Sequence, residues 1–333
     1  MKSEQIVLAS RPHGLPSSQN FRVEKKDLGP LNDNEVLLKS WYISVDPYMR
    51  GRMSNAKSYA QPFQVDQPIV GSVVAKVIES RSKTFIEGDI VFGSLPWATY
   101  CIEKAENLRK VDTQAAPPSY SLGILGMPGL TAYFGMMDIG KPKAVETVVI
   151  SGAAGAVGMV AGQIAKMQGS YVVGIAGSDE KCKILKEQFG FDEAINYKTA
   201  KIMTKIIAAA CPKGVDVYYD NVGGEITDAV IDNLNFHSRI VLCGQISLYN
   251  NTEVPMGPRL FPKLLTRSIL VQGFIVSNYS DRFGEAFAHL TQWVNEGTLK
   301  YTETIIHGFD KLPDAFLGLF SGKNQGKMLI ETD

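Results

Sequence analysis

The sequence has few of the residues that build metal centres or disulfide frameworks. Its four cysteines, Cys101, Cys182, Cys211 and Cys243, are scattered, and no Cys-x-x-Cys pair or Cys/His cluster occurs. Disulfide scaffolds and structural zinc sites depend on such closely spaced ligands. None of the four histidines stands near a second candidate ligand. We therefore expect a reduced, cytoplasmic protein without a metal.

The chain also lacks net charge and long apolar runs. Its 34 Lys and Arg residues balance its 34 Asp and Glu residues, so no bulk field favours nucleic acid or an anionic membrane. No apolar run reaches the length of a membrane span, and the N-terminal apolar core is too short for a secretory signal. The 333 residues allow two domains. We expect a globular protein whose partners are small molecules.

Residues 148–181 give the clearest structural signal in the chain. A β-branched apolar run at 148–150 leads into small residues, then into a helical pattern up to residue 167, and then into a second apolar run at 171–176. Strand, glycine turn, helix and strand in this order form a βαβ unit. The sequence therefore predicts a parallel sheet at the centre of the chain.

The turn of this unit matches the dinucleotide-binding fingerprint G-x-G-x-x-G in a variant form. Ala153 occupies the first slot, and Gly155 and Gly158 occupy the other two. Gly155 would let the backbone approach a pyrophosphate, and Gly158 would let the helix lie against the strand. The phosphate would rest on the free N–H groups at the helix N-terminus, which we expect near Ala156 and Val157.

The end of the second strand distinguishes NADP(H) from NAD. An NAD site has an acidic residue there to bind the ribose hydroxyls, whereas this chain has Ala176, Gly177 and Ser178. The Ser178 hydroxyl can donate to a 2′-phosphate, and Lys181, one turn into the next helix, can neutralise it. We therefore predict NADP(H), with an ordinary surface lysine at position 181 as the alternative.

The pattern differs between the two ends of the chain and its middle. Residues 1–122 hold short apolar runs between Gly and Pro turns, which is typical of a barrel or curled sheet. Residues 123–296 alternate strands and helices, which predicts a doubly wound α/β sheet with ligands beyond the carboxyl ends of its strands. Residues 297–333 are expected to rejoin the first domain. Within residues 123–296 the expected helices are 179–189, 199–211, 223–235 and 281–296, and the expected strands are 194–196, 215–220, 239–243 and 269–276. The expected strands of the last segment are 302–306 and 327–330.

Six further motifs follow one another in an order that resembles a single enzyme family. They are LASRP (8–12), DPYMRGRM (46–53), GMPGLTAY (126–133), DNVGG (220–224), CGQISLYN (243–250) and GKNQGK (322–327). They resemble the zinc-independent double-bond reductases of the medium-chain dehydrogenase/reductase superfamily: prostaglandin, alkenal and, most closely, bacterial curcumin reductases. The resemblance spans nearly the whole chain and implies a Rossmann domain beside a β-rich, GroES-like barrel.

The resemblance also implies a set of NADPH contacts. Lys181 and Tyr197 would bind the 2′-phosphate, Asn221 would lie near the pyrophosphate or the nicotinamide ribose, and Asn324 would close the site from the returning segment. The remaining contacts would lie along the ribose and nicotinamide: Thr131, Cys243, Gly244, Gln245, Ile246, Ser247, Tyr249, Phe274, Ile275 and Val276.

The reaction that the resemblance implies is conjugate reduction without a metal. NADPH would deliver hydride to the β-carbon of an α,β-unsaturated ketone or aldehyde, and the enolate oxygen would need a hydrogen-bond donor. Tyr249 and Tyr48 are the candidate donors, together with the ribose 2′-hydroxyl, and both would line the substrate pocket. Arg50 could attract an acidic substrate tail, and Tyr279 could touch substrate.

Two other functions stay open at this point. One is a quinone reductase of the same superfamily, and the other is an NADPH-binding protein without turnover. The family is usually dimeric, and residues 269–275 are a candidate edge strand for a homodimer across a two-fold axis.

Overall fold

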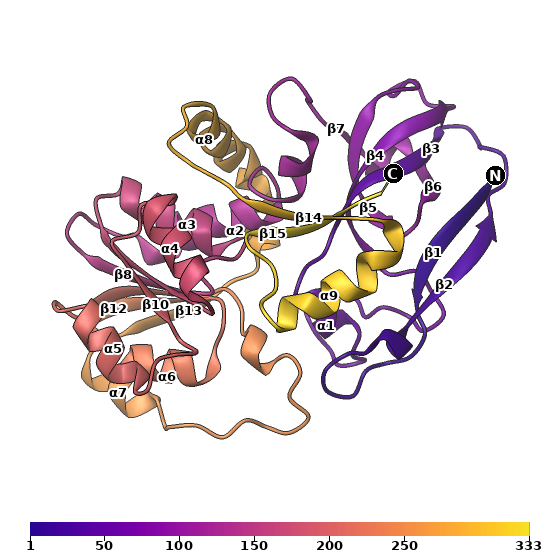
Figure 1. Ribbon diagram of the computed structural model, residues 1–333. Helices are drawn as coiled ribbons and strands as arrows, with labels where there is room; N and C mark the ends of the chain where they lie inside the picture. The colour runs from indigo at the N-terminus through magenta and orange to yellow at the C-terminus, as the bar shows by residue number, and fades with distance from the viewer. Residues whose placement is uncertain (333) are drawn as a thin grey trace.

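The computed structural model describes residues 1–332, and most of their strands belong to two large sheets (Figure 1). One sheet lies in the half that holds the middle of the chain. The other lies in the half that holds both termini, where the indigo N-terminal strands and the yellow C-terminal helix meet (Figure 1). No helix in this described part is long and apolar enough to cross a membrane.

The first sheet has six strands that pair in parallel throughout, in the order β10-β9-β8-β11-β12-β13. Because β8 lies between β9 and β11, the strand order reverses beside β8, and ligands bind at such a switch point. The predicted doubly wound α/β fold is confirmed. The strands are β8 (Thr147–Ser151), β9 (Tyr171–Ala176), β10 (Glu193–Asn196), β11 (Val215–Asp220), β12 (Leu234–Leu242) and β13 (Leu270–Gly273).

Helices cover both faces of this sheet, so its strands read as continuous apolar runs. In β8, Val148 and Ile150 pack into one core and Val149 into the other. The core on the Val148 side includes residues of α2 (Met127–Phe134), α3 (Gly158–Met167), α4 (Asp179–Glu187) and α8 (Phe283–Asn295). The core on the Val149 side includes residues of α5 (Met203–Ala210), α6 (Gly224–Asp232) and α7 (Phe261–Thr266).

The second sheet is mixed and joins the two ends of the chain. Its order is β14-β15-β3-β4-β5-β7, and β6 pairs with β3. This arrangement supports the proposal that residues 297–333 belong with residues 1–122. Its strands are β3 (Glu35–Ser44), β4 (Val70–Ser80), β5 (Ile90–Pro96), β6 (Tyr100–Lys104), β7 (Arg109–Lys110), β14 (Glu303–His307) and β15 (Lys327–Glu331); β1 (Lys2–Leu8) and β2 (Phe21–Asp27) form a separate antiparallel pair.

Two helices of this half matter for the site. The short α1 (Met49–Arg52) follows β3, and α9 (Leu312–Phe320) connects the parallel strands β14 and β15. In the core, the Phe316 ring of α9 meets the edge of Trp97 at 6.4 Å between ring centroids and that of Phe21 at 6.1 Å. This aromatic cluster fixes the returning segment against the N-terminal strands.

Several element bounds differ from those expected. Helix α3 begins at Gly158, after the turn residues Ala156 and Val157, and α5 begins at Met203 rather than near residue 199. Helix α2 continues into a π-helical segment, Gly135–Gly140, and α9 was not expected. Such deviations reflect turn and packing interactions that override local apolar periodicity.

Candidate cofactor and substrate site

The turn after β8 has the backbone geometry that its glycines predict. Gly152 has φ +59°, and a Cβ at Gly158 would stand 2.4 Å from the Gly152 carbonyl oxygen and 2.7 Å from the Cα of Ala153. A Cβ at Gly155 would approach the Gly152 oxygen to 3.1 Å. Ala153 is fully buried, so the first slot accepts its methyl group. The N-terminus of α3 therefore lies close to the strand end, with its first N–H groups free for an anion.

The end of β9 presents two lysines and two hydroxyl groups. Ser178 caps α4 by accepting the Lys181 N–H at 3.2 Å, so its own proton remains available to donate. A Cβ at Gly177 would stand 3.2 Å from the Tyr197 hydroxyl and 3.4 Å from Cε of Lys198. Burial lowers the pKa of Lys181, and the charge of Lys198 lowers it further. A phosphate between the Lys181 and Lys198 ammonium groups would neutralise their repulsion and accept hydrogen bonds from them.

One buried carboxylate holds the loops after β11 and β12. Asp220 is fully buried, and both of its oxygens accept hydrogen bonds from the loop residues around it. Four groups donate to Oδ1, each at 2.9 Å, and two donate to Oδ2. The donors are the hydroxyls of Ser151, Tyr218 and Thr227, the N–H groups of Val222 and Gly223, and the Nε2 of Gln245.

These bonds connect the Asn221 loop to the Tyr249 loop. Asn221 Nδ2 donates to the Ser151 carbonyl at 2.8 Å, which ties this loop to the end of β8. Gln245 donates to Asp220 through its side chain at 2.8 Å and to the Tyr249 hydroxyl through its backbone N–H at 3.3 Å. The Asp220 carboxylate therefore sets the position of the Tyr249 phenol through a single intervening residue.

The other predicted residues of these loops lie close by. Ile246 donates its N–H to the Asn221 carbonyl at 3.4 Å, and the Ser247 hydroxyl donates to the Val222 carbonyl at 2.6 Å. A Cβ at Gly244 would meet that same Asn221 carbonyl oxygen at 3.2 Å. The Cys243 thiol is buried, which raises its pKa to about 12. It is thus a neutral, inert side chain in this loop at physiological pH.

The returning segment reaches the glycine turn. The Gly326 N–H donates to the Ala154 carbonyl at 2.9 Å, and Asn324 Nδ2 donates to the Gly326 carbonyl at 2.8 Å. Two residues before Asn324, the Gly322 carbonyl accepts from Lys181 Nζ at 2.7 Å. Asn324 therefore lies in the returning segment between its contact with Lys181 at the predicted 2′-phosphate corner (Ser178, Lys181, Tyr197) and its contact with the glycine turn.

Tyr48 and Tyr249 come from the two halves, and Tyr59 influences the pKa of one and is influenced by the other. Burial raises the pKa of Tyr48 well above its ordinary value, the Asp46 carboxylate raises it further, and the Arg52 guanidinium lowers it. The pKa of Tyr59 is raised by partial burial of its ring and next by the Tyr249 phenol, although 62% of its surface is exposed. The Tyr59 phenol also raises the pKa of Tyr48. Tyr59 therefore lies within electrostatic range of Tyr48 and of Tyr249.

Arg50 bridges the two halves through its guanidinium group. The residue is 6% exposed. Its Nε donates to Asn250 Oδ1 at 3.0 Å, directly after Tyr249, and its Nη2 donates to the Gly14 carbonyl at 2.8 Å. These contacts support a role in placing the Tyr249 loop more directly than a contact with a substrate tail.

The remaining predicted residues pack under the cofactor loops. The Thr131 hydroxyl donates to the Met127 carbonyl at 2.7 Å within α2, and the Thr131 carbonyl accepts from the buried Tyr219 hydroxyl at 2.9 Å. Phe274 is buried, and Ile275 and Val276 begin the next 3₁₀ segment. The Tyr279 ring stacks on Phe134 at 4.6 Å between ring centroids. The Tyr279 ring thus packs against the core of the cofactor half.

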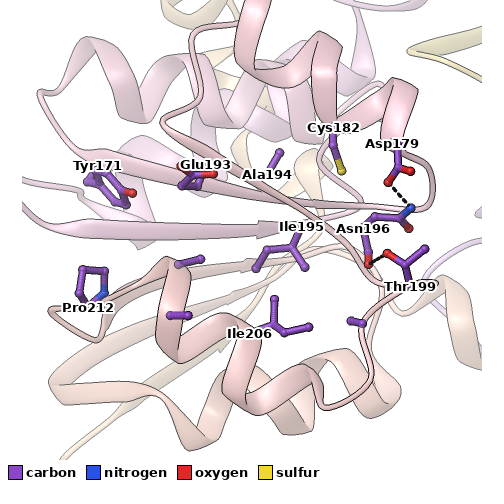
Figure 2. A pocket seen from close by; sticks show the side chains of 13 residues that line it. Tyr171, Asp179, Cys182, Glu193, Ala194, Ile195, Asn196, Thr199, Ile206 and Pro212 are labelled. Atoms are coloured by element: carbon purple, nitrogen blue, oxygen red, sulfur yellow. Dashed lines mark hydrogen bonds between the residues drawn. The ribbon is translucent and has the colours of Figure 1, made fainter.

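A separate hollow lies on the outer side of the edge strand β10 (Figure 2). It is lined by residues of β10, α4 and α5, and none of the predicted cofactor residues is among them. At one end, Asn196 Nδ2 donates to Asp179 Oδ1 at 2.7 Å (Figure 2). This bond positions the residue before Tyr197, and so the hollow borders the predicted 2′-phosphate corner but does not include its residues.

Four residues of the site escaped the sequence-based prediction. Asp220 and Lys198 stand inside or beside predicted motifs, and their positions after strand ends were a usable signal. Lys327 ends the predicted motif GKNQGK, but its partner Asp46 lies in a distant part of the chain. Tyr59 stands in none of the predicted motifs.

Within residues 1–332, no group of three or more His, Cys, Asp or Glu side chains could hold a metal ion. Two family models match the chain: an "N-terminal domain of oxidoreductase" over residues 4–111 and a "zinc-binding dehydrogenase" over residues 156–292. The name of the second model is that of a superfamily domain and is no evidence for a zinc site in this chain.

Close relatives cover the chain almost completely. A Bacillus subtilis NADP-dependent oxidoreductase, YfmJ, is 55% identical over 98% of this chain and 97% of its own length. The NADPH-dependent curcumin reductase of Escherichia coli is 45% identical over 99% of this chain and 96% of its own. The crystal structure of CurA from Vibrio vulnificus with NADPH superposes with a TM-score of 0.95 at 45% identity, covering 99% of both chains.

Proposed function

The chain belongs to the zinc-independent medium-chain dehydrogenase/reductases, a family of NADP-dependent oxidoreductases, and we propose that it reduces the carbon–carbon double bond of α,β-unsaturated ketones and aldehydes. The observation that carries this proposal is the pairing of a phosphate-binding turn and a two-lysine corner with tyrosines from both halves. The curcumin reductase name of one relative supports an enone as the substrate class.

The residues present fit NADP(H). Gly158 lets α3 lie against the end of β8, because a side chain there would collide with the turn, and Gly155 keeps the turn tight. This brings the N-terminus of α3 to the strand end, where a pyrophosphate would bind. Ser178, Lys181, Tyr197 and Lys198 offer hydroxyl and ammonium donors for a 2′-phosphate. The loops from Asn221 and from Cys243, with Phe274, Ile275, Val276 and Thr131, are proposed to hold the ribose and nicotinamide, and Asn324 to close the site.

The cofactor supplies a hydride to the β-carbon, and the protein stabilises the charge that develops on the carbonyl oxygen. A neutral phenol is the donor for that oxygen. Burial raises the pKa of both Tyr48 and Tyr249, so both phenols keep their protons at neutral pH. Gln245 donates its N–H to the Tyr249 oxygen, which leaves the phenolic proton free to point at substrate. We assign Tyr249 as the principal donor and Tyr48 as the second.

The proposed activity is tested by following the loss of NADPH absorbance with three acceptors: an alkenal, an aryl enone and a quinone. Turnover of the enone and alkenal supports the proposal. Turnover of the quinone alone would identify the chain as a quinone reductase of the same superfamily. Absence of turnover with all three, alongside measurable NADPH binding, would identify a binding protein.

We also propose that the chain forms a homodimer through the open edge of β13. Leu270 and Val271 are 52% and 38% exposed on this edge strand, and Leu265 of the preceding helix is 80% exposed. An apolar strand edge of this kind pairs readily with a second copy across a two-fold axis. The double substitution Leu270→Asp and Val271→Lys should convert the dimer to a monomer by light scattering, and an unchanged mass would contradict this interface.

A further inference from the structure

Lys327, the first residue of β15, has a fully buried ammonium group. The residue is 1% exposed. Its Nζ donates to Asp46 Oδ1 at 2.9 Å, to the Val45 carbonyl at 2.8 Å and to the Met328 carbonyl at 3.1 Å. An ammonium has three donors, so all of them are satisfied. Two of the three go to Val45 and Asp46, where the turn that contains Tyr48 begins.

Asp46 belongs to the turn that carries Tyr48. The residue is 4% exposed, and its Oδ2 accepts from the Ser44 hydroxyl. Its carbonyl accepts the Met49 N–H at 3.2 Å, which closes the turn into α1 with Tyr48 inside it. The side chain and the backbone of Asp46 are thus fixed at once, and the Tyr48 backbone has little freedom left.

The residue before Lys327 contacts the phosphate-binding turn. The Gly326 N–H donates to the Ala154 carbonyl. Gly326 has φ +70°, and a Cβ there would stand 1.9 Å from the Thr302 carbonyl oxygen, so only glycine fits at this position. The adjacent residues Gly326 and Lys327 therefore connect the glycine turn of one half to the Tyr48 turn of the other.

We propose that Lys327 is a positioning residue that, through Asp46, sets the distance between the Tyr48 phenol and the bound cofactor. Replacing a buried ion pair by apolar groups is often neutral or stabilising for the fold. The stability of the fold alone therefore does not account for the pair of Asp46 and Lys327. The pair of Asp46 and Lys327 connects the turn of Tyr48, a candidate donor, to the glycine turn that is proposed to bind the pyrophosphate. This inference rests on the proposed enone reduction.

The test uses the double variant Asp46→Asn/Lys327→Met, which removes both charges and leaves no unpaired ion. We expect kcat for the enone to fall by up to about tenfold, the full loss expected of Tyr48→Phe, because a displaced phenol can lose no more than a deleted one. NADPH affinity should stay within about threefold, since the phosphate corner is untouched. Lys166→Met is the matched control, because Lys166 also donates to one carboxylate and to a backbone carbonyl, and its kcat should not change.

A double-mutant cycle separates positioning from general weakening of the fold. Tyr48→Phe added to the double variant should cause no loss beyond that of Tyr48→Phe alone, because both changes remove the same interaction. Losses that multiply, or an unchanged kcat in the double variant, would overturn the proposal.

Hydrogen exchange keeps the inference testable if the wild type reduces no enone, an outcome that would refute the proposed function by itself. The amides of Met49, Arg50, Gly51 and Met53 donate within the Tyr48 turn and α1. Faster exchange there in the double variant, but not in Lys166→Met, supports the positioning role. Equal exchange in all three proteins refutes it.

Discussion

Two buried carboxylates, one in each half of the molecule, hold the two candidate donor tyrosines by different means. Asp220 accepts from six neutral groups, all between residues 151 and 245 of the cofactor half. Asp46 accepts from one hydroxyl and from the ammonium of Lys327, which is 281 residues away in the chain. Within one domain, neutral donors suffice to shape a loop. Where two distant segments must meet, this chain uses a buried charge pair.

The largest expected effect is the loss of kcat/KM when the hydroxyl of Tyr249 or Tyr48 is removed. Tyr249→Phe should lower kcat/KM for an aryl enone about 10²- to 10³-fold, the usual cost of losing one oxyanion donor. Tyr48→Phe should cost less, about tenfold. Steady-state kinetics with both variants measures this, and NADPH affinity serves as the control for an intact cofactor site. A larger loss for Tyr48→Phe would reverse the assignment of the principal donor.

The next effect concerns the hydrogen bonds that Asp220 accepts from six neutral groups. Asp220→Asn replaces an acceptor oxygen by an NH₂ group that faces other donors, so we expect the free energy of unfolding to fall by about 2–3 kcal/mol. Urea unfolding measures this loss. Asp314→Asn, an exposed carboxylate in the first turn of α9, should change stability by less than about 0.5 kcal/mol. Equal effects of the two substitutions would show that the Asp220 network contributes nothing.

The next prediction concerns Lys181 and the affinity for NADPH. Lys181→Ala should weaken NADPH binding about 10- to 100-fold, because a charge-assisted contact with phosphate is lost, and should leave NADH binding nearly unchanged. Fluorescence titration with both cofactors measures the difference. Lys183→Ala is the control, since its side chain is 69% exposed two residues away. Equal losses for NADPH and NADH would count against a phosphate contact of Lys181.

The smallest effect is a dependence of stability on alkaline pH that both halves share. Burial raises the pKa of Cys101 in β6 and of Cys211 after α5 from 9.0 to about 12. Because the folded pKa is the higher one, each thiol stabilises the fold fully below pH 9, and this contribution declines as pH rises from 9 to 12. Cys101→Ala and Cys211→Ala should each flatten the decline seen in urea unfolding between these limits. An unchanged slope in either variant would contradict the burial of that thiol.

Local sequence pattern predicted the cofactor half better than the other half. The strands at 171–176 and 215–220 have the predicted bounds, and the glycine turn lies where its fingerprint placed it, because a βαβ unit is encoded by neighbours in sequence. The helix α9 was not predicted, because its sequence LPDAFLGLF is apolar at most positions and lacks the regular polar and apolar pattern of a surface helix. The pair of Asp46 with Lys327 could not be predicted, since it depends on two segments that meet only in the folded chain.

The measurement that tests the central claim most directly is the position of the transferred hydride. The protein is incubated with an aryl enone and NADPH that carries deuterium at C4 of the nicotinamide, and the product is analysed by NMR. The account predicts a saturated ketone with deuterium on the β-carbon. Deuterium on a carbinol carbon, which would mean reduction of the carbonyl group, would contradict it.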